Sequence, residues 1–219
     1  MGLAIFDLDN TLLGGDSDHA WGEFLISRKL VDAATHGTRN DEFYRQYTEG
    51  RLNIQEYVRF TLGPVLGFSL DQLDELHREF MEEFVRPMML PRAMNLIDDH
   101  KSAGDHCLIM SATNAFITRP IAREFAADDL LATDLVIQGG HYTGDISGVP
   151  CFQEGKVIRL RQWLELQNER YSFDSSTFYS DSINDLPLLE AVHSAVAVDP
   201  DDRLAAVADR KGWKIISLR

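Results

Sequence analysis

The sequence contains only two cysteines and no long apolar run. Cys107 and Cys151 form no metal-binding or redox motif, and Cys107 is expected in the core, so nothing requires an oxidising compartment. No window approaches the roughly 20 apolar residues of a membrane span. The acidic Asp7 also precedes any apolar run long enough for a signal peptide. These absences predict a cytoplasmic protein that does not associate with a membrane.

Positive charge is also scarce in this chain. It has 21 lysines and arginines against 35 aspartates and glutamates, for a formal net charge of −14. Such an acidic protein is a poor partner for nucleic acid or for an anionic membrane. The seven histidines show no zinc-binding spacing, which argues against zinc. An anionic substrate would therefore need positive charge built into its binding site.

Short apolar runs recur along the 219 residues, with helical patterns between them. Runs that are apolar on both faces are typical of a parallel sheet covered by helices on both sides. We therefore expect a doubly wound, Rossmann-like α/β core. The predicted strands are 3–8, 106–111, 176–180, 194–198 and 213–218, and the predicted core helices are 114–127, 156–168 and 183–192.

The segment 16–88 interrupts this alternation because it contains no convincing strand. Ser69 and Gln72 form a capping box that starts a helix over 70–85, and an apolar stripe follows at helical spacing. An earlier helix is expected from about 17 to 30. The segment is therefore predicted to be a helical insert.

The insert divides the predicted core into two parts. We expect a helical cap domain at 16–88 and an α/β core formed by 1–15 and 89–219. The two prolines within 86–93 mark the return to the core, because a long helix would not continue through them. The glycine-rich segment 138–150 is expected to form a hairpin or a loop.

Side chains able to perform chemistry follow the predicted strands, at the edge where open α/β sheets bind ligands. An Asp-x-Asp-x-Thr motif begins at Asp7, a Ser-Ala-Thr-Asn segment begins at Ser111, Lys156 lies at a helix start, and Asp-Ser-Ile-Asn-Asp begins at Asp181. The four carboxylates of these motifs would repel one another without a cation. Mg²⁺ prefers carboxylate oxygens, water and substrate phosphate. The set therefore predicts magnesium-dependent chemistry on a phosphate group.

These motifs, in this order, resemble the haloacid dehalogenase (HAD) superfamily of phosphatases. The resemblance is to its phosphoserine-phosphatase-like branch, subfamily IB, which carries a helical C1 cap after the first motif. It covers nearly the whole chain, and the predicted insert lies where such caps belong. The resemblance implies a phosphoric monoester hydrolase that acts on a small-molecule phosphate ester.

The same resemblance implies catalytic roles for four residues. Asp7 is the nucleophile that forms an aspartyl-phosphate, and Asp9 is the general acid and then the general base. Asp9 can serve in both steps only if its pKa lies near the working pH, and a neighbouring carboxylate shifts the pKa in that direction. Ser111 donates to the transferring phosphoryl group, and Lys156 neutralises charge on the nucleophile and the phosphate.

The resemblance also implies ligands for the metal and the substrate. Mg²⁺ would be held by Asp7, by the backbone carbonyl of Asp9, by Asp181, and by Asp185 through water or in support of the other ligands. The substrate would contact Ser111, the adjacent backbone at Ala112, Asn184 and Asp16.

Each motif also has an ordinary structural interpretation. Asp7 and Asp9 could cap a turn, Ser111 could cap a helix, Lys156 could be a solvated surface residue, and Asp185 could be an N-cap before Pro187. Thr113 could replace Ser111 if the register differs. The segment QEGKV does not form a P-loop, because Pro150 stands at the first glycine position and Val157 replaces the required serine or threonine.

The substrate depends on the cap, because specificity needs contacts beyond the phosphate. Asp16 occupies the place where phosphoserine phosphatases bind the substrate amine with an acid, although Asp16 could equally be the N-cap of the helix starting near Ser17. An arginine for the carboxylate of phosphoserine cannot be assigned among the three cap candidates, Arg45, Arg51 and Arg59. Histidinol phosphate, which has no carboxylate, and phosphoserine therefore both remain candidate substrates.

Two other functions remain open from the sequence. A phosphotransferase or mutase of the same superfamily would pass the phosphoryl group to a second substrate instead of water. A non-catalytic phosphate-binding regulatory domain would be free to lose its nucleophile, whereas Asp7 is present here. The sequence does not determine the oligomeric state.

Overall fold

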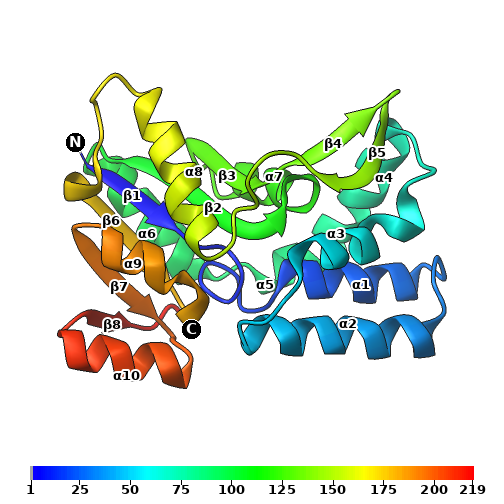
Figure 1. The fold of residues 1–219 in the computed structure, drawn as a ribbon, viewed down its shortest axis with the longest axis horizontal. Helices are drawn as coiled ribbons and strands as arrows, with labels where there is room; N and C mark the ends of the chain where they lie inside the picture. The colour runs from blue at the N-terminus through cyan, green and yellow to red at the C-terminus, as the bar shows by residue number, and fades with distance from the viewer. Residues whose placement is uncertain (1) are drawn as a thin grey trace.

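A parallel sheet forms the centre of the molecule, and β1 lies in its interior. The computed structural model describes residues 2–219 and arranges the strands in the order β3-β2-β1-β6-β7-β8 (Figure 1). Each neighbouring pair is parallel, and Leu3 of β1 aligns with His106 of β2 and with Ser176 of β6. The strands are β1 (Leu3–Phe6), β2 (His106–Asn114), β3 (Asp129–Thr133), β6 (Ser176–Ser180), β7 (Ser194–Val198) and β8 (Lys214–Ile216).

Helices cover both faces of this sheet, because β1 is apolar on both sides. Ala4 and Phe6 belong to one hydrophobic cluster, and Leu3 and Ile5 belong to another. The first cluster includes α6 (Pro91–Ser102) and α7 (Ala115–Glu124), and the second includes α8 (Glu154–Glu165), α9 (Leu186–Ala191) and α10 (Asp202–Lys211). The prediction of a doubly wound α/β core is confirmed.

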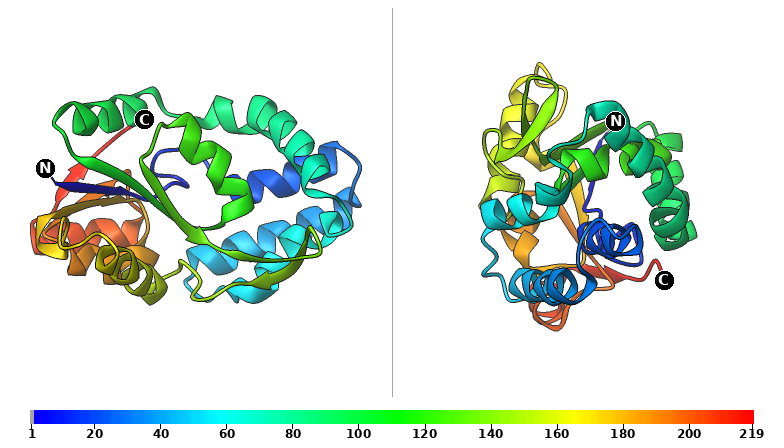
Figure 2. Two further views of the ribbon diagram at one scale, coloured as in Figure 1. Left: turned by 90° about the horizontal axis from the view of Figure 1, so that it is seen from above. Right: turned by 90° about the vertical axis from the view of Figure 1, so that its right-hand side faces the viewer.

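The helical segment between β1 and β2 lies beyond the end toward which β1 points (Figures 1 and 2). Each of its major helices begins at a side-chain N-cap, and the capping box at Ser69 and Gln72 is present. Trp21, Phe24 and Phe80 are fully buried where α1 packs against the last helices of this segment. The elements are α1 (Ser17–Ser27), α2 (Ala33–Thr48), α3 (Ile54–Leu62), η1 (Gly63–Val65), α4 (Leu70–Phe80), η2 (Met81–Val85) and α5 (Arg86–Met88).

The chain enters and leaves this helical segment at neighbouring positions. Leu13 forms an isolated antiparallel bridge with Met89, and the Gly14 N–H donates to the Met88 carbonyl at 2.7 Å. Paired entry and exit segments are what an insertion into a continuous core requires. The division into a cap at 16–88 and a core at 1–15 and 89–219 nevertheless stays a prediction.

The glycine-rich excursion is a hairpin made of β4 (Leu135–Gln138) and β5 (His141–Ile146). Its turn residues, Gly139 and Gly140, have φ angles of +60° and +80°, which glycine adopts without strain. The hairpin packs against α3, where Gln55 donates to the Gly144 carbonyl at 3.2 Å and Arg59 pairs with Asp145.

The observed elements differ from the predicted ones at several boundaries. Strand β3 was not predicted, because its short apolar stretch is flanked by acidic residues that resemble a loop. Strand β2 continues past residue 111 to Asn114, which carries the whole Ser-Ala-Thr-Asn segment. Helix α8 begins at Glu154 rather than at Lys156. No helix within residues 2–219 has the length and apolar character needed to cross a bilayer.

Candidate active site

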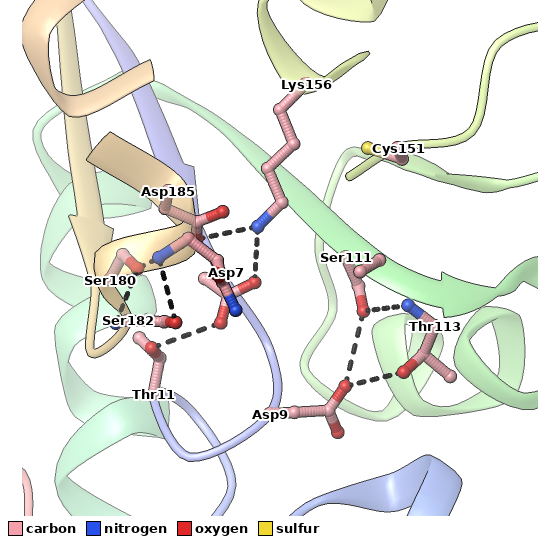
Figure 3. Close-up of polar contacts among 12 residues, drawn as sticks. Asp7, Asp9, Thr11, Ser111, Thr113, Cys151, Lys156, Ser180, Ser182 and Asp185 are labelled. Carbon is pink, nitrogen blue, oxygen red and sulfur yellow. Dashed lines mark hydrogen bonds and ion pairs between the residues drawn. The ribbon is translucent and has the colours of Figure 1, made fainter. Parts of the chain in front are cut away.

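Asp7 occupies the carboxyl end of the central strand. Its backbone N–H donates to the Tyr179 carbonyl at 2.9 Å, which continues the pairing of β1 with β6 past Phe6. The chain then turns sharply through Asn10, whose φ of +59° lies in the left-handed region that asparagine tolerates. The Asp7 side chain is buried, and its carboxyl group points toward Lys156 and Thr11 (Figure 3). Its position therefore follows directly from the strand that ends before it.

Lys156 is the buried cation of the site. Its Nζ lies 2.7 Å from Asp7 Oδ1 and 2.7 Å from Asp185 Oδ2 (Figure 3). Burial lowers the pKa of Lys156, but the negative charges of Asp185 and Asp7 outweigh burial and raise it above its ordinary value. Lys156 is therefore an ammonium ion, and the interpretation as a solvated surface lysine is wrong.

The backbone before Lys156 leaves little freedom for this side chain. A Cβ atom on Gly155 would lie 2.0 Å from the carbonyl oxygen of Pro150, so only glycine fits at that position. Gln153 takes a φ of +49° as the loop turns into α8. This close approach fixes the first turn of α8 against the backbone at Pro150.

Asp181 and Asp185 follow β6 and converge on the same place. Thr11 Oγ1 donates to Asp181 Oδ1 at 3.0 Å and lies 3.4 Å from Asp7 Oδ2, so the threonine links the two carboxylates. Ser180 Oγ donates to Asp185 Oδ2 at 2.8 Å. Neither the bridging role of Thr11 nor the contact from Ser180 was predicted, although Thr11 belongs to the first motif.

Asp9 is held on the β2 side of the site. Its Oδ2 accepts hydrogen bonds from Thr113 Oγ1 at 2.9 Å and from Ser111 Oγ at 3.3 Å, and its Oδ1 accepts from the Ser17 N–H at 2.7 Å. Sequence reasoning treated Thr113 as a replacement for Ser111, but both residues contact Asp9. Ser111 is not a helix N-cap, because Asn114 caps α7.

The pKa values of Asp7 and Asp9 are both raised. Burial is the largest cause and raises the pKa of Asp7 to about 7, although Lys156 acts in the opposite direction. Burial also raises the pKa of Asp9 to about 6, and the charge on Asp16 adds to it. The predicted direction for Asp9 is thus present, but its main physical cause is desolvation rather than the neighbouring Asp7.

Asn184 holds the helical segment to the core. Its Nδ2 donates to the Tyr47 carbonyl at 2.7 Å, and Gln153 Nε2 donates to the Gly50 carbonyl at 3.3 Å. Arg203 of α10 donates to the Thr48 carbonyl. Three core side chains therefore fix the carboxyl end of α2, and the contact expected between Asn184 and phosphate remains a prediction.

A cavity opens from these residues into the helical segment. Its acidic lining consists of Asp7, Asp9, Asp16 and Asp18. The rest of its wall is formed by Ser111, Ala112 and Thr113 on the core side and by Phe43, Tyr44, Tyr47, Leu52, Ile54 and Tyr57 on the helical side. Asp16 also accepts a hydrogen bond from the His19 N–H at 2.8 Å, so the same carboxyl group caps α1 and lines the cavity.

No arginine or lysine within residues 2–219 belongs to the lining of this cavity. The three arginines that could have bound a substrate carboxylate are exposed on the surface. Arg45 pairs with Glu42, Arg51 pairs with Glu49 and Glu42, and Arg59 pairs with Asp145. The organic part of a substrate would therefore meet acids and aromatic rings.

The acids near Lys156 are of the kind that binds a hard cation. Among residues 2–219, however, no group of three or more histidine, cysteine or acidic side chains is arranged closely enough to hold a metal ion. Burial and the charge on Asp7 raise the pKa of Asp181 well above its ordinary value, and Asp185 raises it further. Lys156 alone does not compensate these carboxylates. Since Asp7 and Asp181 both contact Thr11 Oγ1, their oxygens face a common point, as ligands of one cation would.

Comparison with known proteins agrees with this geometry. The family model of haloacid dehalogenase-like hydrolases matches residues 4–190. The chain belongs to this family. It is 45% identical over 219 residues to the histidinol-phosphatase of Neisseria meningitidis serogroup C, with 99% of each chain covered. These similarities identify a phosphatase of the HAD superfamily.

Two solved structures have the same fold. A protein with unknown function from Bordetella pertussis Tohama I is 42% identical with a TM-score of 0.91, covering 99% of this chain and 98% of that one. A substrate-bound phosphoserine phosphatase is 15% identical with a TM-score of 0.71, covering 100% of this chain and 93% of that one. The second similarity extends to the fold alone.

Proposed function

We propose that this phosphatase hydrolyses histidinol phosphate with the help of Mg²⁺ and through a phosphoryl group carried on Asp7. The observation that carries the choice of substrate is the cavity beside Asp7, which has acids but no arginine or lysine in its lining. The carboxylate of phosphoserine would be repelled there, whereas the amine and imidazole of histidinol phosphate would be attracted. The 45% identity to a histidinol-phosphatase supports the same substrate.

In the first step, Asp7 attacks phosphorus and the bond from phosphorus to the ester oxygen breaks. Asp9 donates a proton to the departing oxygen, which leaves as the alcohol. Lys156 lies 2.7 Å from Asp7 and offsets negative charge during the attack. Ser111, which already contacts Asp9 at 3.3 Å, donates to the transferring phosphoryl group.

In the second step, Asp9 accepts a proton from water as the water oxygen attacks phosphorus. The bond between phosphorus and Asp7 breaks, which releases inorganic phosphate and restores both acids. Asp7, Asp181 and the backbone carbonyl of Asp9 would hold Mg²⁺, supported by Asp185. When bound, Mg²⁺ supplies positive charge to the phosphoryl oxygens.

Closure of the helical segment would exclude bulk water from this chemistry. Its residues Phe43, Tyr44 and Tyr57 form one wall of the cavity, and Asp7 and Ser111 form the other. We therefore propose that 16–88 acts as a cap, as the sequence predicts. The cytoplasmic location also stays an expectation from the sequence.

The test is phosphate release from histidinol phosphate and from phosphoserine, measured in parallel with Mg²⁺ and with a chelator. We expect kcat/KM for histidinol phosphate to exceed that for phosphoserine by about a hundredfold or more. Activity should disappear with the chelator and return with Mg²⁺. A preference for phosphoserine would overturn the choice of substrate. Phosphate yields below one per ester cleaved would instead indicate a transferase.

A further inference from the structure

Asp18 is one of the four acids that line the cavity, and the proposed reaction gives it no role. It lies in the first turn of α1, two residues after the N-cap Asp16, and only 5% of it is exposed. Its Oδ1 has no hydrogen-bond partner among the described residues. Asp18 also belongs to the residues that line the cavity. Asp18 is therefore a residue of the cavity wall that carries an unpartnered, buried acceptor.

Helix stability does not explain why this acid is buried. An acid in the first turn of a helix is favourable because it faces the positive end of the helix dipole. Asp71 occupies the same position in α4, two residues after the N-cap Ser69, and it is exposed to solvent. The helical position can thus be filled without burying the carboxylate.

Burial of Asp18 is unfavourable unless something else binds it. Desolvation is the largest cause that raises its pKa, followed by the negative charges of Asp16 and Asp9. A hydrogen bond from the Thr61 side chain lowers the pKa of Asp18, but this effect is smaller than those of burial and of the neighbouring charges. A bound cation or N–H donor would relieve both the desolvation and the repulsion.

The wall around Asp18 selects the shape of such a group. Phe43, Tyr44, Tyr47 and Tyr57 line the same cavity, and the charge of Asp18 acts on Tyr57. Aromatic rings favour flat groups and cations. A planar ring that carries an N–H or a positive charge combines both requirements.

We propose that Asp18 binds the N–H of a planar, cationic ring of the substrate and makes this enzyme selective for esters that carry such a ring. Asp16, whose charge acts on Asp9, binds the primary amine. This inference rests on the proposed function, in which the ring is the imidazole of histidinol phosphate. It assigns Asp16, the N-cap of α1, and Asp18, in the first turn of α1, to two different nitrogen groups of one small molecule.

The test compares two esters that differ in the ring alone. Histidinol phosphate and 2-aminopropyl phosphate share the amine and the phosphate, and the second lacks the imidazole. In Asp18→Asn, the ratio of kcat/KM for the first ester to that for the second should fall by about ten- to hundredfold, as expected for the loss of one charge-assisted hydrogen bond. Asp71→Asn is the matched control, since it removes an acid from the same helical position, and it should keep the wild-type ratio.

An unchanged ratio in a folded Asp18→Asn enzyme would overturn the inference, because a purely structural role changes both esters equally. Thermal melting establishes folding, and Asp18→Ser replaces Asp18→Asn if the latter is unfolded.

If the wild-type enzyme releases no phosphate from histidinol phosphate, the proposed function fails separately. In that case, the Asp18 inference is tested by comparing how strongly histidinol and 2-aminopropanol inhibit the hydrolysis of an aryl phosphate. Selectivity for histidinol that is lost in Asp18→Asn supports the inference, and equal inhibition by the two amines overturns it.

Discussion

The two ends of the cavity differ in how their acids are compensated. At the sheet end, Asp7 contacts Lys156 and Thr11, and Asp9 accepts three hydrogen bonds. At the helical end, Asp18 is buried without a partner for Oδ1, among aromatic rings. The sheet end has the groups needed to cleave any phosphate ester. At the helical end, a group of the substrate would have to supply the hydrogen bond that Asp18 lacks. Chemistry and selectivity are therefore built from separate parts of the chain.

The largest effect should come from Asp7→Asn, which removes the nucleophile and keeps the shape of the side chain. We expect kcat to fall by about a thousandfold or more for every ester, whether or not the ester carries a ring. Phosphate release under saturating substrate measures this. Asp174→Asn, on an exposed turn, is the control. If some esters were still cleaved at the wild-type rate, the sheet end would not be common to all substrates.

Lys156→Met should have the next largest effect, because it leaves two buried carboxylates without their shared cation. We expect a decrease of about a hundredfold in kcat. The free energy of unfolding should also fall by about 3–5 kcal/mol at neutral pH, as for other broken buried ion pairs. Urea unfolding and steady-state kinetics measure the two effects. Lys211→Met, which removes a surface ion pair with Glu190, should change neither by much. Normal activity in Lys156→Met would contradict the assigned role.

A smaller effect is expected from Arg203→Ala, which removes one of the three contacts that fix the carboxyl end of α2 to the core. Looser docking of this wall should raise KM for histidinol phosphate about two- to fivefold and leave kcat nearly unchanged. Faster amide exchange over α2 would report the loosening directly. Arg210→Ala removes a second exposed arginine from α10 and should change neither. If KM and the rate of amide exchange were unaltered, the contacts from Asn184 and Gln153 would be enough to hold the carboxyl end of α2.

The smallest effect concerns pH and the attachment of the helical segment to α7. His77 donates from Nε2 to the Ile117 carbonyl at 2.9 Å, and burial lowers its pKa below the ordinary value of 6.5. Protonation of His77 therefore favours the unfolded chain, so the contribution of His77 to stability is complete above about pH 6.5 and decreases as pH falls toward the lowered pKa. The raised pKa values of Asp7 and Asp9 act in the opposite direction over the same range. Unfolding free energies between pH 5 and about pH 8 measure the trend. The unfolding free energy of the wild type relative to His77→Gln should decrease as pH falls below about 6.5, and a difference that does not vary with pH would exclude His77 as a source of the trend.

Sequence reasoning succeeded where a short segment carries its own information. The Asp-x-Asp-x-Thr motif, the capping box at Ser69 and the apolar character of β1 depend on neighbouring residues and are present in the structure. It failed for β3, whose acidic flanks resemble a loop, and it could not choose among Arg45, Arg51 and Arg59, which all form ion pairs at the surface. Whether a side chain faces a cavity or the solvent depends on the packing of distant helices, which local spacing does not specify.

The amino-acid sequence by itself determined which residue types follow each strand and where the helices are capped, because these features arise from contacts within a few residues. Only the tertiary structure decided which buried acids lie next to a positive charge or a hydrogen-bond donor. Lys156 reaches Asp7 across 149 positions of the chain, whereas Asp18 receives no ammonium at all from the described residues. Electrostatic compensation acts over a few ångströms in space, so chain folding determines it and sequence proximity does not.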